Sequence, residues 1–237
     1  MEKKHPQSGP GGNGMSRSAL IVQGGWDGHE PVQVSGRFAD MLRNEGFSVE
    51  MSDSLDAFLD VEKLKSLDLI VPVWTMGQIR NDQVQPVLEA VASGVGIAGC
   101  HGGMCDSFRE NVDWQFMTGG QWVAHPGNDG TPHRIYIRHG SNPITEGLED
   151  FDVSTEQYYL HVDPAIEVLA VTTFPVADGF HAANGFVSMP VVWTKRWGRG
   201  RVFYNSLGHH NDVFDIPAAR EMMRRGFLWA AKGKGGI

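Results

Sequence analysis

Cysteine is scarce in this sequence. Only Cys100 and Cys105 occur among 237 residues, which is too few for a framework of disulfide bonds. Their spacing, with four residues between them, matches no common zinc-binding signature. Isolated cysteines are typical of proteins that keep their thiols reduced, so we expect a cytoplasmic location.

Long hydrophobic runs are also missing. No stretch of about 18 apolar residues, the length that a membrane-spanning helix needs, occurs in the chain. The segment Met1–Gly14 lacks the apolar centre of a secretory signal peptide. A membrane is therefore not expected as a partner.

Positively charged residues are fewer than negatively charged ones. The chain carries 20 lysines and arginines against 28 aspartates and glutamates, for a formal net charge of −8. Nucleic acids bind to broad cationic faces, so they are not expected as partners. Two small basic groups are instead expected to form a hairpin turn and a solvated helix face, namely Arg196, Arg199 and Arg201, and Arg220, Arg224 and Arg225.

The composition, 41% hydrophobic and 20% charged, is that of an ordinary globular protein, and the length suits a single core. Residues 1–17, rich in Gly, Pro and Lys, are expected to form a disordered leader or tag. Residues 18–232 form the predicted single domain, and 233–237 are expected to be a frayed tail.

From Ala19 onward, short apolar runs alternate with amphipathic segments, a rhythm that predicts βαβ units on a parallel sheet. The expected elements of the first half are strand 19–25, a helix from Pro31 closed by Gly46, strand 47–51, strand 67–74 weakened at its end by Pro72, a helix from Asn81 or Asp82 closed by Gly94, and strand 95–100. Those of the second half are strands 134–139 and 168–174, a hairpin over 191–207, and a helix from Pro217 that places Ala219, Met222, Met223, Phe227 and Ala230 on one face.

Histidines gather in loops that follow predicted strands. Ligands of open α/β sheets bind beyond the carboxyl ends of the strands. A single loop histidine is more often structural, but several in this one class of loop predict a shared site. The loops that carry a histidine beside acidic residues or glycines are 24–30, 99–106, 122–127 and 208–212.

The run GCHGG at 99–103 predicts a tight bend between a buried strand and a helix. Small residues around one polar residue permit an elbow that lifts the central side chain, His101, into the site, while Cys100 is expected to face the core. Gly102 and Gly103 begin the next helix, whose N–H groups can hold an anion. The alternative is a plain glycine-rich turn.

Six motifs occur in a fixed order: GGWDGHE, GxHGG, GGQWVAHPG, NPIT-GL, EQYY and PVVWTKRWGRGRVFYNSLGH. They cover almost everything from Ala19 to Ala231, and together they resemble the ThuA-like (trehalose-utilisation) family. The resemblance implies an α/β fold, a flavodoxin-like three-layer sandwich with a mostly parallel central sheet, similar to class I glutamine amidotransferases. Those enzymes present a nucleophilic Cys at the elbow, whereas this chain has His101, so a glutaminase reaction is not expected.

The resemblance also implies the site residues. His101, His209 and Glu156 are the expected acid–base catalysts, because a carboxylate fixes the tautomer of a neighbouring imidazole and raises its pKa. Asp212 is available to orient His209 or His210. Helix capping and solvation are the alternatives for the last two histidines.

The remaining candidates, of which Asp27, His29 and His125 are family-like positions, are assigned to substrate binding. Whether Tyr158 or Tyr159 accompanies Glu156 is left open, because alternate residues of a strand share a face, and His161 either joins the site or packs. Tryptophan rings commonly grip the apolar faces of sugars, although they are also ordinary core material. The candidates are Trp26, Asp27, His29, Trp74, Gly102, Gly103, Trp122, His125, Tyr158, His161 and His210.

A second interpretation is that the same site binds a divalent metal. His29, His101, His125, His209 and Glu156 are residue types that bind zinc or manganese, although no pair has a diagnostic local spacing. No cofactor is otherwise expected.

The family resemblance implies sugar metabolism, of trehalose or a related disaccharide, often beside a sugar dehydrogenase that makes 3-keto sugars. We expect a sugar isomerase or a keto-glycoside lyase or hydrolase that uses proton transfer. The alternative is a non-catalytic sugar-binding or regulatory module, favoured by the missing elbow Cys. A hydrolase using Cys100 or Cys105 is the least favoured reading, and edge strands leave a homo-oligomer open.

Overall fold

The computed structural model describes residues 17–140 and 142–235. Residues 1–16 of the expected leader and 236–237 of the expected tail lie outside this range. Arg17 already belongs to the first strand, and a short 3-10 helix, η5 (Ala231–Gly235), takes in most of the segment expected to fray. None of the helices described is both long and apolar enough to cross a membrane.

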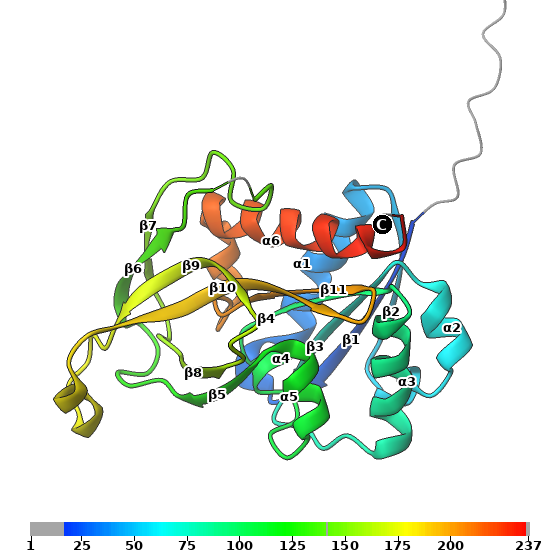
Figure 1. Ribbon diagram of the computed structural model, residues 1–237, viewed down its shortest axis with the longest axis horizontal. Coiled ribbons are helices and arrows are strands. Elements are labelled where there is room, and N and C mark those ends of the chain that lie inside the picture. The colour runs from blue at the N-terminus through cyan, green and yellow to red at the C-terminus, as the bar shows by residue number, and fades with distance from the viewer. Residues whose placement is uncertain (1–16, 141, 236–237) are drawn as a thin grey trace, which may run out of the picture.

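A nine-stranded sheet runs through the middle of the protein (Figure 1). Its strands, in spatial order, are β2 (Phe47–Ser52), β1 (Arg17–Gly25), β3 (Leu69–Thr75), β4 (Gly96–Cys100), β11 (Gly200–Asn205), β10 (Val187–Trp197), β9 (Glu167–Phe174), β6 (Pro132–Ile137) and β7 (Phe151–Ser154). The pairs from β2 to β11 are parallel, and those from β11 to β7 are antiparallel. A separate two-stranded sheet joins β5 (Gly120–Ala124) to β8 (Tyr159–Val162).

Helices cover both faces of the parallel half (Figure 1). On one face lie α1 (Pro31–Asn44) and α6 (Pro217–Ala230), and on the other α2 (Val61–Ser66), α3 (Asn81–Ala92), α4 (Gly102–Cys105) and α5 (Val112–Thr118). Each face has its own hydrophobic core. The expected face of the last helix is confirmed, since all five of its apolar residues are buried on α6. The result is a mixed α/β sandwich with a flavodoxin-like parallel centre.

Pro72 acts differently from the expectation. It does not end β3, which continues to Thr75 along β1. The pairing of β3 with β4 instead stops at Ile70, before the proline, which has no N–H to donate. Beyond that point α4 packs against β3, where a Cβ on Gly103 would lie 3.1 Å from the Cα of Val73.

Two helix glycines offer a matched test of this packing. A Cβ on Gly226 of α6 would collide with the Phe203 ring, whereas one on Gly36 of α1 would meet nothing within 4 Å. We expect Gly226→Ala to lower the free energy of unfolding by about 1–3 kcal/mol through overpacking. Gly36→Ala should raise it by about 0.5–1 kcal/mol through helix propensity. Urea titration measures both, and equal effects would contradict the packing.

Candidate functional site

Four parallel strands deliver polar residues to one edge of the sheet. Because the carboxyl ends of β1, β3, β4 and β11 meet there, the residues that end or follow these strands meet as well: His29, Thr75, His101 and His209. The imidazole centroids of His29 and His101 are 4.6 Å apart, those of His29 and His209 5.0 Å, and those of His101 and His209 5.4 Å.

Glu156 reaches the same point from the antiparallel half, on the segment between β7 and β8, which is not the strand we expected there. One ligand atom from each of His29, His101, Glu156 and His209 lies within 4.8 Å of all the others, and all four residues are buried. We call these four residues the His–Glu cluster.

The bend at the end of β4 is as sharp as the sequence predicts. His101 has φ 48° and ψ −140°, a region that costs a non-glycine residue about 1–3 kcal/mol. Cys100 faces the core, as expected. His101 is not open to solvent, however, since only 1% of it is exposed and Tyr158 stacks on its ring at a centroid distance of 3.9 Å.

The glycines after the bend make room for the cluster. A Cβ on Gly102 would lie 2.6 Å from Cε1 of His29, so a larger residue would displace that ring. Gly102 and Gly103 are both buried, and α4 is a single turn of 4 residues. They therefore pack against the inner side of the site, Gly102 on His29 and Gly103 on the backbone of Val73.

The outer nitrogen of each cluster imidazole faces an oxygen, and two of these three oxygens are within hydrogen-bonding distance. Nδ1 of His101 lies 2.7 Å from the carbonyl oxygen of Ser206, which can only accept, so Nδ1 carries the proton. Nδ1 of His29 lies 2.9 Å from the hydroxyl of Thr75. Nε2 of His209 lies 3.9 Å from Oδ1 of Asp129.

The inner nitrogens face one carboxylate. Oε2 of Glu156 lies 3.2 Å from Nε2 of His101 and 3.3 Å from Nδ1 of His209. Within the described part of the chain, nothing except histidine ring nitrogens approaches the Glu156 carboxylate as a donor. Nδ1 of His209 can carry a proton and donate it to the carboxylate, but Nε2 of a neutral His101 cannot, because the proton of that ring is on Nδ1. A lone pair of His101 therefore faces the carboxylate oxygen unless a proton or a cation lies between them.

Burial keeps these imidazoles neutral. It lowers the pKa of His29 to about 2, with help from the neighbouring His101 and His209. Burial likewise lowers the pKa of His101 well below its usual value, against the opposing effect of the Ser206 carbonyl. The pKa of His209 is also lowered, mainly by burial, although Glu156 opposes the shift. Nitrogen lone pairs of neutral rings are what metal ions bind.

A second ring of residues lies outside the cluster and is partly open to solvent. Nε2 of His125 lies 3.6 Å from Oε1 of Glu156, and 31% of the His125 side chain is exposed. His210 lies between Glu30 and Asp129, at 3.7 and 3.5 Å. These two carboxylates take the place that we expected for Asp212, which points to solvent.

The tryptophans differ in their distance from the cluster. Trp26 is 46% exposed and places the edge of its ring on His29, at 4.8 Å between centroids. Trp122 packs beside His125 at 5.4 Å. Trp74 is half-buried and lies beneath Gly24 and Gly77.

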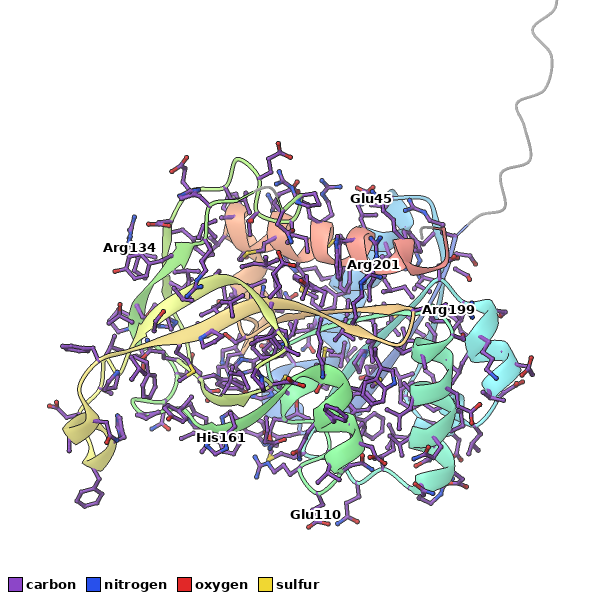
Figure 2. The ribbon with its side chains drawn as sticks, in the orientation of Figure 1. Glu45, Glu110, Arg134, His161, Arg199 and Arg201 are labelled. Carbon is purple, nitrogen blue, oxygen red and sulfur yellow. The ribbon has the colours of Figure 1, made fainter. Side chains whose placement is uncertain are left out.

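Three candidates lie away from the cluster. His161 is exposed on β8 and borders an open groove beside Phe116 (Figure 2). Tyr159 packs on Phe174, which settles that Tyr158 is the tyrosine facing the cluster. Asp27 is exposed in the short 3-10 helix η1 (Asp27–His29).

Sequence reasoning missed several polar neighbours of the site. Glu30 lies at the end of a loop that it identified and Asp129 lies two residues beyond another, so their position was a usable signal. Thr75 looked like the end of an apolar strand, and Ser206 contributes only its backbone. Asp106, buried at the end of α4, closes the identified loop 99–106, but no role was assigned to it.

The thiols take no part in this chemistry. Cys100 and Cys105 are both buried, and burial raises the pKa of each above its usual value. Because the thiolate is the nucleophile, neither is suited to attack a substrate.

Comparison with known structures agrees with this fold. A ThuA-like protein from Bacteroides uniformis ATCC 8492 is 18% identical with a TM-score of 0.74, and the match covers 94% of this chain and 95% of that one. A second, from Parabacteroides merdae ATCC 43184, is 18% identical with a TM-score of 0.71, covering 92% and 91%. A cytoplasmic protein from Salmonella typhimurium LT2 is 12% identical with a TM-score of 0.62, covering 89% and 97%. At these identities the likeness concerns the fold alone.

The sequence itself gives a firmer result. No curated protein matches it. A family model does match, over residues 18–230, which is nearly all of the described chain, and that model is ThuA, trehalose utilisation. The chain therefore belongs to the ThuA, or trehalose utilisation, family.

Proposed function

We propose that this protein is a divalent-metal-dependent enzyme of sugar metabolism whose cation is held by the His–Glu cluster. The observation that carries the proposal is the contact of one buried carboxylate with the inner nitrogens of His101 and His209, at 3.2 and 3.3 Å. A cation at the centre of the cluster accepts electron pairs from both nitrogens and from the oxygen at once, which a proton cannot do.

The donor set fits such an ion. Ligand atoms about 2.0–2.2 Å from a tetrahedral cation lie about 3.3–3.6 Å from one another, and the two N···O distances above are close to the lower end of this range. Three imidazoles with one carboxylate suit zinc or manganese better than calcium or magnesium, which prefer oxygen ligands. The Thr75 hydroxyl and the Ser206 carbonyl fix the ring orientations, as partners of metal-bound histidines usually do.

This assignment changes the roles of all three expected catalysts. His101, His209 and Glu156 hold the ion, because all three are buried and turned toward the centre of the cluster. A bound divalent ion would polarise a carbonyl or hydroxyl oxygen of the sugar. His125 is the group placed to move a proton, since it is partly exposed and adjoins Glu156.

The substrate class follows from the family and from the site. The ThuA family is described by trehalose utilisation, and the exposed ring of Trp26 beside His29 is suited to the apolar face of a sugar. A C–H next to a ketone is acidic enough for a histidine base. We therefore propose a 3-keto disaccharide, made by a sugar dehydrogenase in the cytoplasm, as the substrate.

Metal analysis of protein purified without added metal tests the cluster. We expect about one zinc or manganese ion per chain in the wild type and almost none in Glu156→Gln. The metal-free variant should be at least as stable as the metal-free wild type, because the amide can donate a hydrogen bond to an imidazole lone pair. Glu167→Gln, which changes a carboxylate that accepts from Thr194, is the control and should keep its ion. A metal-free wild type that zinc does not stabilise would refute the site.

Thr75→Val probes the support of His29. Loss of the hydroxyl at Nδ1 should weaken zinc binding by about 10- to 100-fold, measured by competition with a chelator. Thr194→Val removes another buried hydroxyl, one bonded to Glu167, and should leave the affinity for zinc unchanged. Similar affinities in the two variants would count against the proposed ligand role of His29.

Turnover of 3-keto-trehalose tests the reaction. Metal-loaded wild type should consume it, and His125→Ala should be slower by about 100-fold or more. His133→Ala, another buried histidine, bonded to the Thr131 carbonyl on β6, should keep its activity. Binding of the sugar by loaded protein without any conversion would select the alternative, a sugar-binding module.

A further inference from the structure

An open pocket of about 480 Å³ lies beside the cluster, between residues 76–79 and 108–111. This volume falls within the range of about 300–1,000 Å³ that is typical of pockets for small ligands. No residue proposed to hold the metal or to move the proton lines it.

We propose that this pocket is a second sugar subsite, which holds the non-reacting ring of a disaccharide and in which Arg109 determines specificity. The proposal rests on the proposed function, because it extends the substrate of that same site.

A chain of contacts links the pocket to the cluster. The Arg109 guanidinium lies over the Trp122 ring, 4.5 Å from its centroid. Trp122 packs beside His125, and His125 adjoins Glu156. The wall of the pocket and the cluster are therefore separated by two aromatic side chains.

The walls of the pocket are held in place. The N–H of Met76 donates to the Asp106 carbonyl at 2.8 Å, and that of Gly77 to the Ser107 carbonyl at 2.7 Å. Met76 has φ 54°. Gly77 lies so close over the Trp74 indole that a Cβ there would overlap the ring. Trp74, expected to bind sugar, thus supports this wall from below.

Arg109 is oriented and still has hydrogens to donate. Nε and Nη2 bind the two carboxylate oxygens of Asp106, which fixes the plane of the guanidinium. In the part of the chain that the structure describes, Nη1 makes no hydrogen bond. The indole Nε1 of Trp122 is buried and lacks a partner as well.

The lining favours a neutral sugar over an anion. Phe108 and Ile79 offer apolar surface, while Gln78 and Asn111 are amides that bond hydroxyl groups. Glu110, at the rim of the molecule (Figure 2), and Asp106 beneath Arg109 would both repel an anionic ligand. A polyhydroxylated ring matches this mixture of donors, acceptors and apolar surface.

Calorimetry with metal-loaded protein tests the subsite, with α,α-trehalose and glucose as probes. The wild type should bind trehalose more tightly than glucose. Arg109→Met keeps the apolar stem on Trp122 but removes the donors, so the affinity for trehalose should fall about tenfold or more while that for glucose is unchanged. Arg134→Met, which changes a surface arginine paired with Asp152 (Figure 2), is the control.

Arg109→Met leaves the buried Asp106 unpaired, which can disturb folding. A second variant therefore tests the subsite without changing this ion pair. Gln78→Trp fills the pocket from the opposite, exposed wall, and should likewise abolish the preference for trehalose. Equal trehalose binding in the wild type and both variants, or a wild type without preference for the disaccharide, would overturn the subsite. Metal content reports separately on the proposed function, because every one of these variants should keep its ion and only Glu156→Gln should lose it.

Discussion

The arrangement of this protein depends on one electrostatic constraint, the burial of a carboxylate among imidazole nitrogens. Glu156 lies where His101 and His209 turn their inner nitrogens toward it, and the outer nitrogen of His101 is committed to a carbonyl. Burial removes the water that would otherwise solvate these groups, so an unbalanced set would be costly. The surrounding fold is organised so that every member of the set points to the same place.

The topology of the sheet brings these residues together with little additional backbone. Three of the four members of the cluster follow parallel strands, so each needs only a short loop to arrive at the common edge. Glu156 comes from the antiparallel half, and Tyr158 stacks on His101 as part of the same segment. His101 has a positive φ, and the glycine after it leaves room for the His29 ring, which a Cβ on Gly102 would approach to 2.6 Å.

Much of the parallel half could be predicted from the sequence, because its signals are local. Continuous apolar runs identify β3 and β4, and the stripe on α6 identifies its buried face. The loops that carry His29, His101 and His209 follow from those strands. The short strands β5, β7 and β8 had no such signal, since each is only 4 or 5 residues long and, unlike β4, only partly buried.

What could not be predicted is the set of pairings across the sheet. The sequence pointed to Asp212 as the partner of the C-terminal histidines, because it is close in the chain, but Asp129 and Glu30 hold that place in space. Likewise, the predicted exposure of His101 overlooked Tyr158, which is distant in sequence and covers the ring. The local pattern of apolar residues does not predict which side chains a distant segment will bury.

The sequence separation of the cluster has a consequence for biogenesis. Its members extend from His29 to His209, so they span most of the chain, and no two of them are neighbours in a single loop. A nascent chain that has emerged only as far as α5 can offer two imidazoles and no carboxylate. Uptake of the proposed ion would then have to wait until His209 has been synthesised and folded, and a truncated or half-folded copy could not hold the ion.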